Sequence, residues 1–372
     1  MHIRILGLFL LLSAVSTWCR ELGSSPAPQP LPPIGPRIYE SFQFPDDRLP
    51  VIDGDLSDWE IVGGDYTQDT FQLLNFFYHD AAKRRAYDPA GFDLRVRTGY
   101  NLSTNRIYVA AEYYDDFHNM DRVTPSRREV GVDDIFELVV DADRSGRAFV
   151  YDASRIRLQN THAQNYHVYF HEREANHLWA WGEQRWLEEE PYGKAASVYD
   201  GVHGSSGLCV LEFWVTPYNY AHPNGPQLSA PAELAAGDTI GMSYAVLDWE
   251  EDETPGTAHF WALADTVLMY CNADFTADFV LAPREDRLER MPVADFRSRA
   301  PRVDHPRAIQ FDNQTRGEAA SFLWDFGDGE TSTEPDPLHR YAGAGTYTVT
   351  LQARNEWGQV RKRKVDYVVL WR

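Results

Sequence analysis

The stretch "TYTVTLQARN", residues 346–355, decides the fold class of the C-terminal part of this chain. Apolar and polar side chains alternate along it, which is the period of a β-strand with one face against a core. The polar face carries threonines and a glutamine, and the apolar face carries Tyr347, Val349, Leu351 and Ala353. The stretch therefore predicts a half-buried strand in a small all-β unit of about seven strands.

The same alternation recurs through the longer N-terminal part. Between residues 38 and 284, apolar runs of strand length are separated by turn residues, and few helical periodicities occur. Three runs predict inward faces: Ile107, Val109, Ala111 and Tyr113; Phe136, Leu138 and Val140; and Ile240, Met242, Tyr244 and Val246. The predicted fold class is all-β, with a large antiparallel β-sandwich followed by a small immunoglobulin-like one.

The first 37 residues predict export rather than folded structure. An apolar run from Ile5 to Val15 follows Arg4, which is the layout of a secretory signal peptide over residues 1–16. The run is shorter than the roughly 20 residues of a membrane helix, so no membrane span is expected. Residues 17–37 form a proline-rich linker. The protein is expected to be secreted or at the cell surface, with lipid attachment at Cys19 as the alternative.

Composition narrows the partners. The net charge of −21 argues against nucleic acid and anionic membranes, and it is compatible with neutral ligands and calcium. The chain has three cysteines. Cys209 and Cys271 either pair in an oxidising compartment, or Cys209 is a small core residue on the face of Leu211 and Phe213.

Several motifs of the large unit occur in the order of a known family. Ile52-Asp53-Gly54 with Leu56-Ser57-Asp58-Trp59 comes first, then "NRIYVAAEYYDD", "VDDIFELVVDADRSG", "LEFWVTPYNY" and "GDTIGMSYAVLDWEED". In this order they resemble the family 9 carbohydrate-binding modules, over about residues 47–284. The resemblance implies a sandwich over residues 38–284 that binds a polysaccharide or oligosaccharide, structural calcium, and an association with enzymes of polysaccharide catabolism.

The C-terminal unit resembles a second family. Trp324-Asp325-Phe326-Gly327-Asp328-Gly329, then His339 and Tyr341, then "GTYTVTL" from Gly345, are similar to the signature of the PKD domain. The resemblance implies an immunoglobulin-like β-sandwich over residues 293–372, joined by a charged connector at residues 285–292. Such domains act as spacers or as interaction modules for other extracellular proteins, so function is sought in the first unit.

Acidic residues suggest two roles. In Asp53-Gly54-Asp55 the glycine permits a turn and the carboxylates accept backbone N–H groups, which predicts a tight loop with Trp59 packed in the core. The oxygen-rich spacing of "DADRSGRAFVYD" partly matches a calcium loop. The predicted calcium ligands are Asp141, Asp143, Ser145 and Asp152, with Asp115, Asp116 and Asp133 at strand ends expected nearby; the alternative is a solvated acidic rim.

Carbohydrate recognition needs flat aromatic faces and polar side chains beside them. The aromatic candidates are Trp179, Trp181, Trp186 and Trp249, and the polar candidates are Asn176, Gln184 and Arg185. If residues 176–181 form a strand, Trp179 and Trp181 share one face. The other interpretation is that these indoles belong to the core.

Other activities remain open from the residues alone. A glycosidase needs two carboxylates across a cleft, and the 56 acids of the chain offer no distinguished pair. Haem between the sheets could use Met120 or Met242, and the histidines His162, His167, His171 and His177 could bind a transition metal. A purely structural surface protein is the remaining alternative. The chain is therefore interpreted as a secreted, non-catalytic carbohydrate-binding protein.

Overall fold

The computed structural model describes residues 38–77, 80–84, 91–120, 133–150, 157–169, 177–249, 258–299 and 307–371. Within them the chain forms two compact units. Unit 1 comprises residues up to Gln43, Ile52–Gly54 and Gly64–Pro283; unit 2 comprises Phe44–Val51, Asp55–Gly63 and Arg284–Arg372. None of the described helices is long and apolar enough to cross a membrane.

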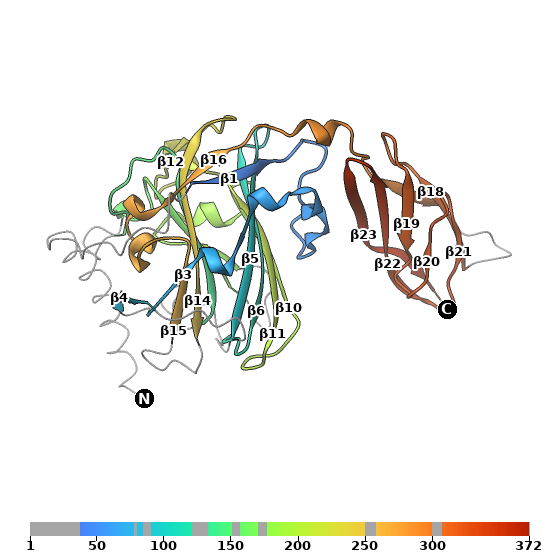
Figure 1. The fold of residues 1–372 in the computed structure, drawn as a ribbon, viewed down its shortest axis with the longest axis horizontal. Coiled ribbons are helices and arrows are strands. Elements are labelled where there is room, and N and C mark those ends of the chain that lie inside the picture. The colour runs from blue at the N-terminus through green and yellow to red at the C-terminus, as the bar shows by residue number, and fades with distance from the viewer. Residues whose placement is uncertain are drawn as a thin grey trace. The chain divides into compact units, whose positions relative to one another are not determined.

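Unit 1 is a sandwich of two sheets (Figure 1). Sheet A contains β3 (Leu74–Phe77), β4 (Asp80–Arg84), β7 (Ile135–Asp141), β8 (Gln164–Tyr169), β9 (His177–Ala180), β14 (Thr239–Trp249), β15 (Ala258–Ala262) and β16 (Ala277–Leu281). Sheet B contains β2 (Thr67–Asp69), β5 (Phe92–Asn101), β6 (Arg106–Asp115), β10 (Gly193–Tyr199) and β11 (Gly207–Val215). A separate hairpin pairs β12 (Tyr218–Tyr220) with β13 (Ala230–Pro231).

Strand β1 (Ile38–Gln43) joins the two sheets. Its first part pairs with β16 in sheet A, Ile38 opposite Asp278, and its last two residues pair with β5 in sheet B. Both pairings are parallel, whereas the other strand pairs are antiparallel. This strand departs from the wholly antiparallel sandwich that the alternating pattern predicts, because period 2 does not distinguish strand direction.

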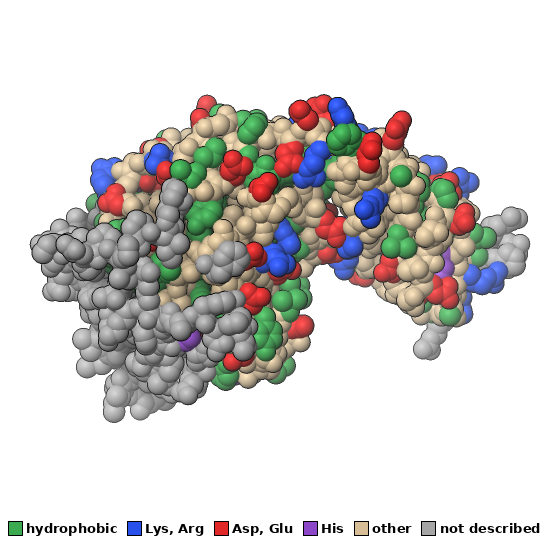
Figure 2. Space-filling view, in the orientation of Figure 1, with side chains coloured by type: hydrophobic (Ala, Val, Ile, Leu, Met, Phe, Trp, Pro, Cys, Tyr) green, Lys and Arg blue, Asp and Glu red, His purple; other side chains and the backbone are tan. Residues whose placement is uncertain are grey.

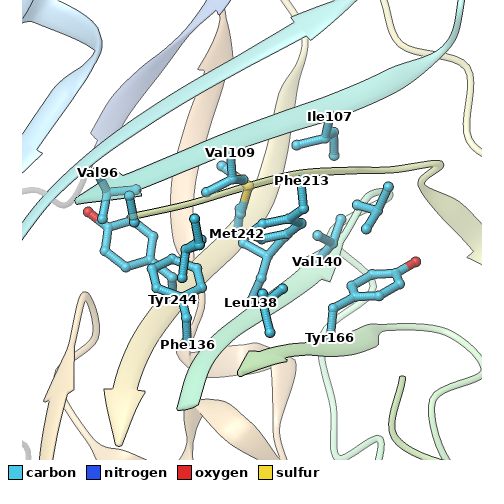
Figure 3. Packing of buried hydrophobic residues seen from close by; sticks show 14 of the residues in the cluster. Val96, Ile107, Val109, Phe136, Leu138, Val140, Tyr166, Phe213, Met242 and Tyr244 are labelled. Atoms are coloured by element: carbon cyan, nitrogen blue, oxygen red, sulfur yellow. The ribbon is translucent and has the colours of Figure 1, made fainter. Parts of the chain in front are cut away.

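The core of unit 1 lies between the sheets and confirms the predicted inward faces. The faces of β6, β7 and β14 named above are buried in one hydrophobic cluster, together with Cys209, Leu211 and Phe213 of β11. Figure 3 shows side chains of the two sheets meeting in this layer, among them Val109, Phe136, Phe213 and Met242. Strict alternation therefore identified the core-facing side chains correctly in these four strands.

A second cluster covers the outer face of sheet A. Here β14 and β7 present Ala245, Leu247 and Val139 to two 3₁₀ helices, η7 (Val267–Tyr270) and η8 (Ala273–Phe275). Cys271, between these helices, is disulfide-bonded, while Cys209 is a buried free thiol. The Cys209–Cys271 pair considered above is therefore absent, and the alternative of a core Cys209 is confirmed. The other short helices are η1 (Leu56–Ile61), η2 (Gly64–Tyr66), η3 (Thr70–Gln72), η5 (Arg185–Glu188), η6 (Pro226–Leu228) and η9 (Asp286–Glu289).

The described residues of unit 2 form a seven-stranded sandwich, as the sequence predicts. One sheet pairs β17 (Phe296–Arg299), β18 (Ala308–Asn313) and β21 (Leu338–Arg340). The other pairs β20 (Thr331–Ser332), β19 (Ser321–Asp325), β22 (Gly345–Asn355) and β23 (Gly358–Leu370). Val349, Leu351 and Ala353 of β22 are fully buried. Trp324 and Tyr341 fill the same core.

The opening motif has the structural role predicted for it. Asp55 accepts a hydrogen bond from the Ser57 amide at 2.9 Å and caps η1. Trp59 is fully buried and packs edge-on against Phe44, with ring centroids 5.1 Å apart. Gly54 has φ +85°, a conformation that favours glycine.

Candidate functional site

The aromatic candidates lie in two places rather than one, with Trp181 in the same outer cluster as Trp179 and Trp249. Trp179 (8% exposed) and Trp249 (4% exposed) are buried in the outer cluster of sheet A. Trp186 is half-buried; its Nε1 donates to His222 O at 3.0 Å, and its ring packs edge-on against Tyr192 and Tyr218. Trp179 and Trp249 are therefore core indoles, whereas Trp181 and Trp186 both combine partial exposure with aromatic neighbours. Trp186 differs from Trp181 in its hydrogen bond to the main chain and in its packing between two tyrosines.

The polar candidates separate in the same way. Gln184 is fully buried, and its Nε2 donates to Gln159 O and Ala221 O at 2.7 and 3.1 Å. Arg185 is exposed at the start of η5. Asn176 lies outside the described residues. The sequence pattern could not separate Gln184 from Arg185, because both follow a short polar turn.

Trp181 belongs to an aromatic group on the outer side of sheet A. Its ring centroid lies 5.6 Å from that of Trp179 and 5.7 Å from that of His167. His167 and Trp179 are cross-strand neighbours on β8 and β9, with centroids 4.4 Å apart. The predicted sharing of a face by Trp179 and Trp181 is thus observed, but the strand β9 ends at Ala180 and only the second indole is half-exposed.

A buried carboxylate lies next to this aromatic group. Glu137 of β7 is 5% exposed, and its Oε1 lies 3.3 Å from His167 Nε2 and 2.5 Å from Asn165 Nδ2. Asn165 Nδ2 also donates to Tyr270 O at 3.0 Å. Alternation with Phe136 and Leu138 puts Glu137 on the outer face of β7, but the sequence does not reveal its pairing with His167, because the register of β8 against β7 is not visible in a local pattern.

The predicted calcium ligands form two groups at opposite ends of β7. Asp141, Asp143 and Ser145 follow the strand, whereas Asp133 precedes it and Asp115 and Asp116 lie at the end of β6 beside that start. Seven residues of strand separate the groups by about 20 Å. The expectation that they lie near one another is wrong, and Asp152 lies outside the described residues.

The loop after β7 is closed by its own backbone. The Asp141 carboxylate accepts from Ser145 N at 3.1 Å and Gly146 N at 2.8 Å, and Asp143 accepts from Ser145 N at 3.0 Å. Burial raises the pKa of Asp141 to about 6, with Asp143 adding to the shift. In this arrangement the regularly spaced aspartates stabilise the turn by accepting hydrogen bonds from its main-chain amides.

The other end of β7 holds a fully buried polar cluster. Asp115 is the last residue of β6, His118 follows it, and Asp134 precedes β7; each is at most 1% exposed. His118 Nδ1 lies 3.2 Å from Asp115 Oδ2, 2.9 Å from Asp134 Oδ2 and 3.6 Å from Cys209 Sγ. Among the described residues, this is the group of three such side chains whose ligand atoms lie close enough to share a metal ion.

Protonation at this cluster is strongly perturbed. Burial raises the pKa of Asp134 to about 8, although His118 and the Trp249 amide act against the shift. Burial would lower the pKa of His118, but its hydrogen bonds to Asp115 and Asp134 outweigh that effect and raise it well above the usual value. Burial also raises the pKa of the Cys209 thiol to about 11. The cluster therefore holds charge in a dry environment.

On the face shown in Figure 2, the described residues form no large patch of only acidic or only basic side chains. There, acidic and basic side chains of the described residues are interspersed with hydrophobic ones.

By its structure the chain is an all-β protein built from two sandwich units. Comparisons with known proteins identify the second unit. Residues 289–370 match the family model of the PKD domain, and this part of the chain is a PKD domain. Collagenase ColA of Bacillus cereus is 45% identical over 53 residues, which are 14% of this chain and 6% of that protein. The PKD1 domain of a Vibrio cholerae metalloprotease is 30% identical over 21% of this chain and 95% of its own, with a TM-score of 0.19.

Another solved structure covers a larger share of the chain. A family 9 carbohydrate-binding module from Caldicellulosiruptor kristjanssonii, in complex with cellotriose, covers 68% of this chain and 96% of its own. Its sequence identity is 16% and its TM-score is 0.41. The collagenase match spans a small fraction of the relative's length, so it bears on the PKD domain and not on the activity of the whole relative.

Proposed function

We propose that this chain is a carbohydrate-binding protein and that Trp181 is the stacking platform of unit 1. The observation that carries the proposal is the half-buried Trp181 ring, backed by Trp179 at 5.6 Å and His167 at 5.7 Å. Two buried rings behind an indole fix its orientation, so little side-chain entropy is lost when a ligand binds. The ordered motifs of the sequence that resemble family 9 modules support the same function.

The chemistry of a pyranose suits this group. The C–H face of a sugar ring packs on an indole, and its hydroxyls need hydrogen-bond partners beside the ring. The exposed guanidinium of Arg185, four residues after Trp181, offers donors on the same loop. Glu137 stays behind the aromatic layer and holds His167 in place.

The test compares Trp181→Ala with Trp371→Ala in the full chain. Trp371 is 85% exposed in unit 2, so its removal deletes an equally large surface indole away from the proposed platform. Cellotriose is titrated calorimetrically, and retention on insoluble polysaccharides is measured in parallel. Trp181→Ala is expected to weaken binding at least tenfold, about 1.4 kcal/mol, while Trp371→Ala binds as wild type. Equal binding by all three proteins would remove Trp181 from the site.

The finer parts of the proposal concern the setting of this binding. We expect no catalysis by these residues and an accessory part in polysaccharide breakdown, with the PKD domain as spacer or interaction module. Reducing-sugar release from the bound polysaccharides separates binding from hydrolysis. Export through residues 1–16 is checked by N-terminal sequencing of protein recovered outside the producing cells.

Calcium remains a separate proposal for the loop that follows β7. An ion there would bind carboxylate oxygens of Asp141 that also accept the amide hydrogen bonds described above, through the lone pairs that those bonds leave open. Chelation followed by calcium addition should raise the thermal midpoint if the ion stabilises this loop, and Asp143→Asn should abolish that rise. An unchanged midpoint would leave the loop closed by its backbone alone.

A further inference from the structure

The buried cluster of unit 1 has more acceptors around one nitrogen than that nitrogen can satisfy. Asp115 Oδ2 and Asp134 Oδ2 both lie within 3.2 Å of His118 Nδ1. An imidazole nitrogen carries at most one proton, which can point to only one of the two oxygens. Asp134 Oδ2 also accepts from Asn119 N, so a proton directed at Asp134 leaves Asp115 Oδ2 as the oxygen that lacks a donor in a site without solvent contact. A cation shared by the three side chains would remove that cost.

The separations match those between ligands of one metal ion. With metal–nitrogen and metal–oxygen distances of about 2.0–2.1 Å, tetrahedrally placed ligands lie about 3.3 Å from one another. The observed separations from Nδ1 are 3.2 and 2.9 Å, and the three ligand atoms all lie within 4.8 Å of one another.

Backbone groups orient each ligand, as outer-sphere hydrogen bonds do in metal sites. Asp115 Oδ1 accepts from Phe117 N at 3.1 Å, and Asp134 Oδ1 accepts from Trp249 N at 2.7 Å. Asp134 Oδ2 also accepts from Asn119 N at 2.6 Å. The main chain of His118 is fixed on both sides, by Ser205 O at 3.1 Å and Gly204 N at 2.8 Å.

We propose that Asp115, His118 and Asp134 bind one divalent first-row transition-metal ion, for which Zn²⁺ is the probe. Two carboxylates balance the charge of such an ion, and the imidazole nitrogen selects against Ca²⁺, which prefers oxygen ligands. Cys209, with Sγ 3.6 Å from Nδ1, is placed to become a further soft ligand. The ion would tie the end of β6 to the start of β7 and so connect sheets B and A.

The experiment uses the full chain, stripped with a chelator and titrated with Zn²⁺ by calorimetry. The variants are His118→Asn and Asp134→Asn, and the matched control is Glu112→Gln, which removes a carboxylate from the outer face of the same strand β6. Wild type and Glu112→Gln are expected to bind one equivalent, and the two cluster variants are expected to bind at least 100-fold more weakly. Equal Zn²⁺ binding by all four proteins would overturn the proposal.

Two readouts on wild type protect the test against misfolded variants. Zn²⁺ should raise the thermal midpoint of the stripped protein more than the same concentration of Ca²⁺. Co²⁺ in place of Zn²⁺ should give visible d–d bands of a nitrogen- and oxygen-ligated ion, with a thiolate charge-transfer band if Cys209 joins. Absence of both the midpoint rise and the d–d bands in folded wild type would also overturn it.

Discussion

The "DFGDG" turn of the PKD domain allows a stability effect to be worked out from two glycines. Gly327 and Gly329 both have left-handed backbone, φ +78° and +88°. A Cβ on Gly327 would lie 2.3 Å from Thr348 O and 3.1 Å from Thr348 N, both backbone atoms of β22. A Cβ on Gly329 would meet nothing within 4 Å. Alanine at either position incurs the left-handed penalty, but only at Gly327 does it also collide with the central strand.

The expected magnitudes follow from these two terms. Gly329→Ala should lower the free energy of unfolding of unit 2 by about 1–2 kcal/mol, the cost of a left-handed alanine. Gly327→Ala should incur the same cost and lower the free energy of unfolding by about 1–3 kcal/mol more, because β22 must shift to relieve the overlap. The total for Gly327→Ala is therefore about 2–5 kcal/mol.

Hydrogen exchange of the β22 amides in the full chain measures this effect locally. Val349 and Leu351 lie in the core, so their amides report opening of unit 2. Exchange should accelerate about 5- to 30-fold in Gly329→Ala and at least fivefold further in Gly327→Ala. If the two variants accelerate exchange equally, the overlap with Thr348 has no energetic consequence and the reasoning is wrong.

Three further predictions concern other parts of the molecule. Met242→Ala, at a fully buried position between the sheets, should lower the free energy of unfolding of unit 1 by about 2–5 kcal/mol in urea titrations, whereas Leu228→Ala, at a position 59% exposed, should change it by less than about 0.5. The Glu212 carboxylate accepts from Asp53 N and Gly54 N at 2.8 Å each, so Glu212→Ala should cost about 2–5 kcal/mol and Glu212→Gln, which keeps one acceptor, clearly less in the same titrations. Desolvation acts to raise the folded-state pKa of Asp295, but hydrogen bonds from Lys364 and the Phe296 amide outweigh it and lower this pKa below 3.8. The stabilisation that the Asp295 carboxylate provides is therefore present above pH 3.8 and is lost as the pH falls through the folded-state pKa. The thermal midpoint of Asp295→Asn should match that of wild type in acid and lie below it near neutrality.

The sequence predicted the strands better than the site. Alternation along β6, β7, β14 and β22 identified which side chains are inward, because burial of one sheet face imposes period 2 on the chain itself. The same rule could not assign the parallel pairing of β1, which depends on a partner strand far along the sequence. It also could not separate Trp181 from Trp179, since exposure depends on where β9 ends and on what covers it.

The metal prediction shows a second limit. Spacing within "DADRSG" indicates a calcium loop, which stays a prediction; the carboxylates there accept the loop's own amides, a geometry that the spacing alone could not foresee. Asp115 was selected for its place at a strand end, yet it shares a buried cluster with His118 and Asp134, and no contiguous motif joins these three residues. Asp134 was visible in "VDD", and only the pairing of β14 with β7 and the turn after β6 bring it to the histidine.

The pairing of β1 with both sheets has a consequence for biosynthesis. Ile38 pairs with Asp278, so the first part of β1, the earliest of the described strands, waits for almost the last segment of its unit before these hydrogen bonds can form, whereas its last two residues can pair with β5 sooner. At about 5–20 residues per second, translation keeps it waiting for roughly 12–48 s. During that interval its backbone donors and acceptors are available to non-native partners. The rate of translation therefore limits when the sandwich can be completed. A chaperone that binds nascent residues 38–43 would raise the yield of native protein.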